Sequence, residues 1–368
     1  MKERHFGIDS LRIVSMIMIP ILHILGHGGI LASAAKLTLP NIVSRALDSA
    51  CFCAVNCYGL ISGYVGYGKK IKYSNIIVLL LQVMTYKILL TAMFAVFLPG
   101  SVDIKGILIS FLPFYSDTYW YFSAYFGMFF FIPFFNYILE TLDKKRLDIL
   151  LLSIFVVFSF ITTLFHQDFA NTKFGYSALW LAALYIIGGY LKKYDIGKNV
   201  KRYKLFLGYV LFAGISYLSR IVIEVVTKIV IKRPVGGGYL FSYVSPTILL
   251  SAVFLFLYFT RLSFNNNIAK KVVAFFTPAT FGVYLIHDYP IVRQYFILHK
   301  FEFLLKYNPF FMILCVILAA ICIFVVCALI DKLRILAFDL LKIKKLSEKT
   351  ELFIKRKITA IYKEKGSA

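Results

Sequence analysis

The chain has 368 residues, of which 60% are hydrophobic and only 16% are charged, and its mean hydropathy is +0.79. A soluble globular protein cannot bury so much apolar surface, so the composition excludes that class and indicates a membrane protein with several spans. The net charge of +23 does not favour nucleic-acid binding, because the basic residues lie in short loops between apolar runs and no recognition module accompanies them.

Ten apolar runs are long enough, or nearly so, to cross a membrane, and the sixth is the shortest. They cover residues 11–28, 47–67, 76–98, 119–139, 147–165, 177–191, 205–231, 243–260, 278–298 and 310–336. The sequence therefore predicts an all-α polytopic membrane protein with about ten transmembrane helices. With the N-terminus inside, most Lys and Arg residues fall in the inner segments, so we expect both termini in the cytoplasm.

The first apolar run carries ionisable residues at both ends. Arg12 lies near its start, and His23 follows roughly 16 Å further along a helix. If Arg12 lies at one membrane interface, His23 lies near the middle of a hydrocarbon core about 30 Å thick, where ionisable groups mark functional sites. We therefore predict that His23 is a proton acceptor, with His27 one turn further on the same face. Asp9 is too far from His23 to pair with it and is expected to brace Arg12 or the entrance to the site, where it is a candidate binding residue.

The second run contains small and polar residues with two interpretations. Ser62, Gly63 and Tyr64 lie near its cytoplasmic end, and Asn56 lies about two turns above them. Small residues let helix backbones approach closely, either for packing or to admit a slim ligand. In the second interpretation, Ser62, Tyr64 and Asn56 are candidate ligand-binding residues.

The loop after the second run is basic. Lys69, Lys70 and Lys72 follow the run directly. Such a cluster either orients the protein and contacts lipid headgroups, or binds an anionic cofactor from the cytosol, for which Lys acts as a point charge.

Aromatic residues gather at the start of the fourth run, where Trp120 lies between Tyr119 and Tyr121. One interpretation is an anchor at the outer membrane interface, since Trp and Tyr are enriched there. The other is that Trp120 stacks against a sugar acceptor.

The seventh and ninth runs also contain ionisable residues. Arg220 and Glu224 are spaced i,i+4, which predicts an intramembrane ion pair. Glu224 is also expected near the depth of His23, where it is a candidate carboxylate to orient a histidine. His287, with Tyr284 on the same helix face, is expected near mid-membrane or above, where it either bonds a neighbouring helix or shares a polar site with His23.

The remaining features predict little chemistry. The six cysteines lie in the second and tenth runs without a CxxC pair or a Cys/His cluster, so neither a disulfide nor a metal site is predicted. Residues 338–368 mix apolar residues with Lys, which predicts a basic amphipathic helix on the inner membrane surface.

Four stretches, taken in order, resemble the membrane-bound acyltransferase-3 family, whose members O-acylate cell-surface glycans. The first, IDSLRIVSMIMIPILH, has the Arg, ten residues, then His pattern of the family's first span. The others are NCYGLISGY, WYFSAYFGMFFFIPFFN and FGVYLIH. The resemblance implies a surface-polysaccharide O-acetyltransferase in the plasma membrane, with an acyltransferase domain over residues 1–337 and a cytoplasmic tail over 338–368. The Lys-rich loop stands where some relatives carry an Arg-x-x-Arg pair at the acyl-CoA site.

The resemblance implies that acetyl-CoA is the donor and that a hydroxyl of an extracytoplasmic or lipid-linked polysaccharide is the acceptor. The nucleotide would bind at the Lys-rich loop and Arg12. His23 would then take the proton of the acceptor hydroxyl, or form an acyl-histidine intermediate, with His287 and Glu224 as further catalytic candidates.

Two other classes of protein also fit the sequence. A transporter or flippase for a glycan or an acyl intermediate suits ten spans with buried ionisable groups, although no repeat and no paired broken helices are evident. A membrane anchor for a polysaccharide-synthesis complex is the third interpretation, in which Arg12, His23 and His287 would be dispensable.

Overall fold

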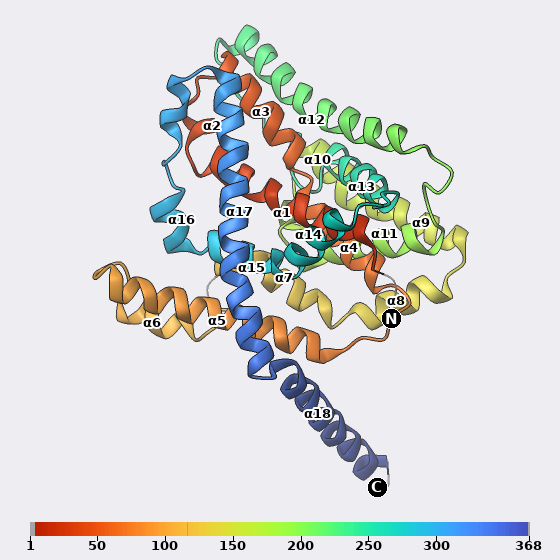
Figure 1. Cartoon of the computed structure of the whole chain (residues 1–368). Coiled ribbons are helices and arrows are strands. Elements are labelled where there is room, and N and C mark those ends of the chain that lie inside the picture. The colour runs from red at the N-terminus through yellow and green to blue at the C-terminus, as the bar shows by residue number, and fades with distance from the viewer. Residues whose placement is uncertain (1–3, 116, 367–368) are drawn as a thin grey trace.

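The computed structural model describes residues 4–115 and 117–366, and within these ranges it contains helices and no strand (Figure 1). Residues 1–3 and 116 of the predicted domain, and residues 367–368 of the predicted tail, lie outside the described residues. The first eight α-helices are α1 (Phe6–Gly26), α2 (Ile30–Ser33), α3 (Leu39–Cys51), α4 (Ala54–Gly66), α5 (Tyr73–Phe97), α6 (Ile104–Ser110), α7 (Trp120–Phe129) and α8 (Ile132–Thr141). The others are α9 (Lys144–Ile154), α10 (Thr162–Phe165), α11 (Ala178–Lys193), α12 (Arg202–Ile231), α13 (Pro246–Thr260), α14 (Asn267–Phe276), α15 (Thr280–His287), α16 (Pro290–Phe296), α17 (Pro309–Leu340) and α18 (Ile343–Gly366).

Seven helical units among the described residues are long and apolar enough to cross a membrane. They cover Phe6–Ser33, Leu39–Gly66, Tyr73–Phe97, Lys144–Phe165, Arg202–Ile231, Asn267–His287 and Pro309–Leu340. An eighth is the pair α7 and α8, which meet at 57°. The remaining two predicted runs correspond to the shorter helices α11 and α13, of 16 and 15 residues. The prediction of an all-α polytopic membrane protein is confirmed.

Two predicted boundaries were wrong, and proline explains both. The second run begins at Leu39 instead of residue 47, because Pro40 lies in the first turn of α3, where its missing N–H is not needed. The ninth run begins at Asn267 and ends at His287, since Pro290 starts the separate helix α16. His287 is therefore at the end of its span instead of its centre.

Helix α1 is the central element of the bundle (Figure 1). It packs against α3, α4, α13, α14, α15 and α17. The helix carries Arg12 near one end and His23 near the other, and an Asp9 to Arg12 ion pair of 2.6 Å lies in its first turns. The predicted bracing of Arg12 by Asp9 is confirmed.

Glycines allow α4 and α11 to pack with their backbones in contact, in an arrangement that we call the glycine seam. A Cβ atom on Gly63 would lie 1.9 Å from the Tyr185 carbonyl oxygen, and one on Gly188 would lie 2.2 Å from the Leu60 carbonyl oxygen. A Cβ on Gly59 would meet the Leu184 side chain at 2.6 Å. The packing interpretation of the small residues is thus confirmed for Gly63.

Replacing Gly63 with Ala is expected to destabilise the protein by about 1–3 kcal/mol, because the added methyl group would overlap the Tyr185 backbone, which cannot rotate away as a side chain can. The measurement is the melting temperature of the detergent-purified protein, determined by size-exclusion chromatography of heated samples. Gly214→Ala in α12 is the matched control, since nothing lies within 4 Å of its added Cβ. Equal melting temperatures for the two variants would contradict the close packing at Gly63.

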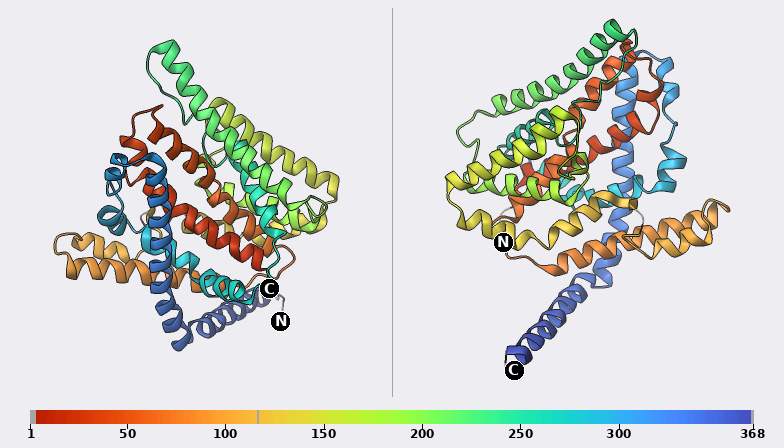
Figure 2. Two further views of the ribbon diagram at one scale, coloured as in Figure 1. Left: turned by 45° about the horizontal axis from the view of Figure 1, so that its top comes forward. Right: turned by 180° about the vertical axis from the view of Figure 1, so that it is seen from behind.

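The C-terminal helix α18 follows α17 and projects from the rest of the protein (Figures 1 and 2). It packs against α5 and the end of α17. Leu346, Leu352 and Phe353 are exposed on this basic helix. Its placement on the inner membrane surface stays a prediction.

Candidate active site

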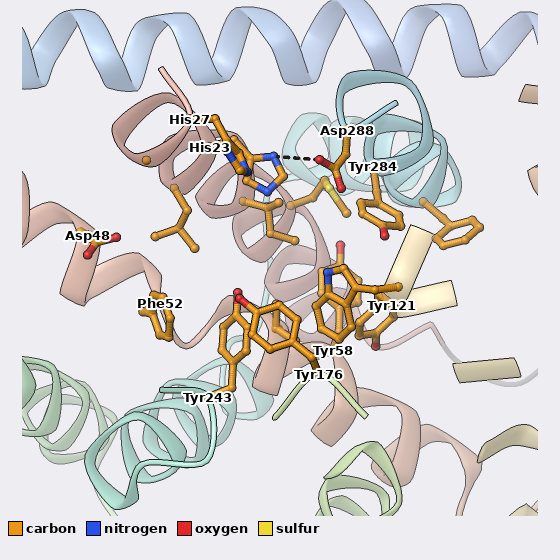
Figure 3. Close-up of a pocket in the computed structure, with 17 residues that line it drawn as sticks. His23, His27, Asp48, Phe52, Tyr58, Tyr121, Tyr176, Tyr243, Tyr284 and Asp288 are labelled. Carbon is orange, nitrogen blue, oxygen red and sulfur yellow. Dashed lines mark ion pairs between the residues drawn. The ribbon is translucent and has the colours of Figure 1, made fainter. Parts of the chain in front are cut away.

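An internal cavity of about 280 Å³ lies beside the second half of α1, and we call it the histidine cavity (Figure 3). Residues of α1, α3, α4, α7 and α15 line it, together with two tyrosines from the loops before α11 and α13. The predicted site residues His23, Trp120 and Tyr284 are on its wall, as is His27. The structure thus brings together residues that are up to 261 positions apart in the chain.

His23 faces a carboxylate in this cavity. Its Nδ1 atom lies 3.6 Å from Oδ1 of Asp288, the residue that follows α15 (Figure 3). Arg293 donates a hydrogen bond of 3.1 Å to the same oxygen and holds the carboxylate in place. The His23 side chain is 19% exposed and that of Asp288 is 7% exposed. The pair is therefore sheltered, while the imidazole remains accessible from the cavity.

The position of the carboxylate favours one tautomer of His23. An acceptor beside Nδ1 favours the tautomer in which Nδ1 carries the hydrogen, and this leaves a lone pair on Nε2. The same arrangement orients the general base of Ser-His-Asp enzymes. Hydrogen bonds of catalytic groups are often longer before substrate binds, so the 3.6 Å separation is compatible with this role.

The ring of His287 lies next to that of His23, with 5.1 Å between the ring centroids. This places the two predicted histidines in one polar site. Nδ1 of His287 is 2.6 Å from the Val283 carbonyl oxygen, which can only accept, so Nδ1 carries the hydrogen. His287 is 1% exposed and does not line the histidine cavity. The contacts suit a residue that supports His23 better than one that touches substrate.

Aromatic rings form the wall that faces the histidines (Figure 3). The rings of Trp120 and Tyr176 are 4.5 Å apart, those of Tyr176 and Tyr243 are 4.9 Å apart, and Phe52 stacks on Tyr243 at 4.6 Å. Trp120 therefore faces the cavity, as the sugar-stacking interpretation requires. The Tyr284 hydroxyl is buried and has no hydrogen-bond partner within residues 4–115 and 117–366, so it can donate to a ligand.

Ion pairs lock helices together here, as the sequence predicted, but Arg220 and Glu224 each pair with α3 instead of with each other. Arg220 bonds Asp48, and Glu224 accepts a hydrogen bond of 3.0 Å from Arg45. Glu224 makes no ion pair with His23 in the part of the chain that the structure describes, and the carboxylate beside His23 is that of Asp288. Asp48 lies on the cavity wall.

A second cavity of about 290 Å³, which we call the lysine cavity, lies beside the first half of α1. Its wall contains five of the predicted binding residues. These are Arg12, Ser62, Lys69, Lys70 and Lys72. The basic loop is thus not only a surface charge cluster, because it encloses a space large enough for a small polar group.

A third cavity, of about 400 Å³, adjoins both of the others. It contains Asp9 and shares Arg12 and Ser62 with the lysine cavity, and Tyr121 with the histidine cavity. Tyr58 lines all three cavities, and its hydroxyl donates a hydrogen bond of 2.7 Å to the Arg12 carbonyl oxygen. Three neighbouring cavities therefore lie along α1 between Arg12 and His23, and Tyr58 lines all of them.

Two predicted binding residues lie away from these cavities. Asn56 is fully buried, donates to the Tyr243 carbonyl oxygen at 2.8 Å and accepts from Trp180 at 3.0 Å, so it positions the aromatic wall. The Tyr64 ring packs on Phe256, with 5.2 Å between centroids. Neither residue lines the histidine or lysine cavity.

Several site residues escaped the sequence prediction. Asp288 had a detectable signal, because an acidic residue directly follows a histidine at the end of an apolar run. Tyr58, Tyr176 and Tyr243 had none, since aromatic residues make up 17% of the chain and most anchor or fill the helices.

Comparisons with known proteins identify one relationship. The acyltransferase-3 family, described as an acyltransferase domain, matches residues 5–330. The matched region includes every residue that lines the histidine and lysine cavities, and all residues of the third cavity except Arg4, and it ends before α18. Neither the comparison with curated proteins nor that with solved structures gave a match.

Proposed function

Because the chain belongs to the acyltransferase-3 family and is a multi-pass membrane protein, we propose that this acyltransferase transfers acetyl from acetyl-CoA to a hydroxyl of a cell-surface polysaccharide. The acceptor is an extracytoplasmic or lipid-linked glycan, and the protein lies in the plasma membrane with both termini in the cytoplasm. A charged CoA thioester cannot cross the bilayer, so the reaction needs a site that donor and acceptor reach from opposite sides.

The observation that carries the proposal is the shared lining of the three cavities. Tyr58 lines all of them, and they lie along α1 between Arg12 and His23. In this proposal the lysine cavity holds the phosphate-bearing end of acetyl-CoA, since Lys69, Lys70 and Lys72 are point charges for phosphate. The acyl-pantetheine arm passes Tyr58 and brings the thioester to His23.

Transfer then needs one base and one hydrogen-bond donor. His23 Nε2 takes the proton of the acceptor hydroxyl while its oxygen attacks the thioester carbonyl carbon. Tyr284 donates its free hydroxyl to the oxyanion that forms. The carbon–sulfur bond breaks, and His23 returns the proton to the departing thiolate, which gives an acetyl ester and free CoA. Asp288 keeps His23 in the required tautomer throughout.

The aromatic wall supports a sugar as the acceptor. Trp120 and Tyr176 present an apolar surface opposite the histidines, against which a pyranose ring can stack. Asp48, at another point on the wall, supplies a carboxylate that can accept a hydrogen bond from a sugar hydroxyl.

The test uses the full-length protein in detergent, acetyl-CoA and surface polysaccharide extracted from cells that lack the protein. We expect thiol release from acetyl-CoA only when polysaccharide is added, together with base-labile acetyl groups on the recovered glycan. Thiol release without acetyl on the glycan would contradict the acceptor assignment. Movement of an intact solute across proteoliposomes without thiol release would instead favour the transporter.

A further inference from the structure

The N-terminus of α5 has no cap of its own. Its N-cap residue, Lys72, makes no side-chain capping hydrogen bond, and the first turn contains no acidic residue. The first backbone N–H groups of a helix have no partner within the helix and carry partial positive charge. A lysine at this position adds further positive charge, so the start of α5 requires an acceptor from another part of the protein.

Glu351 of α18 supplies that acceptor. Its Oε2 atom accepts a hydrogen bond of 2.9 Å from the Ser74 backbone N–H, and its Oε1 atom accepts one of 2.6 Å from Lys355. Ser74 is 2% exposed and Glu351 is 9% exposed, so the contact is sheltered from water. Burial raises the pKa of Glu351, but the hydrogen bonds from Lys355 and Ser74 outweigh it and lower the pKa to about 2. The carboxylate therefore stays ionised at physiological pH.

The capped turn is also part of the lysine cavity. Lys72 and Asn75, on either side of Ser74, both line this cavity. Lys355 lies 5.9 Å above the ring of Tyr73, which in turn contacts the cavity residue Phe129 with 6.0 Å between centroids. A residue of the tail, which lies outside the region matched to the family, thus fixes the backbone that carries Lys72, one of the three lysines of this cavity.

We propose that Glu351 is a positioning residue for the donor site, and that α18 completes this site by capping α5 and holding Lys72 toward the phosphates of acetyl-CoA. The proposal rests on the proposed function, because it takes the lysine cavity as the CoA site. Without the cap, the first turn of α5 would fray, and Lys72 would have to be ordered each time a donor binds.

The experiment compares full-length variants in detergent, with coenzyme A as the titrated ligand. Glu351→Ala is expected to weaken CoA binding about fivefold, equivalent to about 1 kcal/mol, which is typical for loss of a helix cap. The KM for acetyl-CoA should rise by the same factor with kcat unchanged, because the histidine cavity is not touched. Glu351→Gln, which keeps an acceptor oxygen, should recover part of the affinity.

Glu348→Ala is the matched control. It removes the same charge from the same helix, one turn away, and should bind CoA like the unmodified protein. Hydrogen exchange at the Ser74 amide should accelerate in Glu351→Ala and not in Glu348→Ala.

The outcomes separate the two proposals. If the unmodified protein does not bind CoA, the donor assignment of the proposed function fails, and this proposal fails with it. If the unmodified protein binds CoA but Glu351→Ala binds it equally well, only the positioning role is overturned. A lowered melting temperature and kcat with an unchanged KM in both Glu351 variants would likewise overturn it, because a purely structural contact would have that effect.

Discussion

Replacing His23 with Ala is expected to lower the rate of acetyl transfer by about 10²–10⁴-fold, the contribution of a positioned general base. The imidazole is the titratable side chain that lines the histidine cavity and has its Nδ1 beside a carboxylate. Its loss removes the base that is proposed to take the proton of the acceptor hydroxyl. The rate is measured by thiol release from the purified protein, and the O-acetyl content of the surface polysaccharide measures it in cells.

His166→Ala is the control for this prediction. His166 lies in the loop after α10, is exposed, and bonds the Tyr239 carbonyl oxygen away from the histidine cavity. Its removal should leave transfer unchanged. Normal acetylation by a folded His23→Ala variant would rule out His23 as either the base or the site of an acyl-histidine intermediate.

Replacing Asp288 with Asn is expected to lower kcat on the order of 10²-fold or more, with little change in the affinity for acetyl-CoA. The substitution keeps the size of the side chain, but an amide can present its NH₂ group to His23 Nδ1 and so favour the tautomer with the proton on Nε2. The base then lacks its lone pair where the acceptor binds. Because Asp288 does not line the lysine cavity, CoA titration should give the same dissociation constant as for the unmodified protein.

Glu224→Gln distinguishes the two candidate carboxylates. The sequence proposed Glu224 as the group that orients a histidine, whereas the structure pairs it with Arg45. Transfer by a folded Glu224→Gln protein should stay within a few-fold of normal. A larger loss of transfer activity for Glu224→Gln than for Asp288→Asn would contradict the orienting role of Asp288.

The sequence predicts the helices well, because the length of an apolar run is a local property. It also predicts how far apart Arg12 and His23 lie, since both are on α1 and the helix rise fixes their separation. The interpretations of the lysine loop and of Trp120 likewise depend on where these residues lie relative to the apolar runs. Each of these predictions depends on residues close together in the chain.

Partners from different helices could not be predicted in this way. Arg220 and Glu224 have the spacing of a helical ion pair, yet α12 packs against α3, where Asp48 pairs with Arg220 and Arg45 pairs with Glu224. Asp48 is 172 positions from Arg220. Asp288 likewise reaches His23 only because α15 packs beside α1.

The glycine seam between α4 and α11 has a consequence for how substrates enter. Carbonyl groups already occupy the space beside Gly63 and Gly188. Helices α4 and α11 therefore cannot slide past each other or separate without breaking this close backbone contact. Ile61, Ser62 and Tyr185, on the same two helices, line the lysine cavity. If this cavity takes the CoA donor, as proposed above, that wall stays fixed, and entry of the pantetheine arm would depend on rotation of individual rings such as those of Tyr58 and Tyr121, whose centroids are 6.2 Å apart. Such a route differs from the rocking of whole helix bundles that alternating-access carriers need.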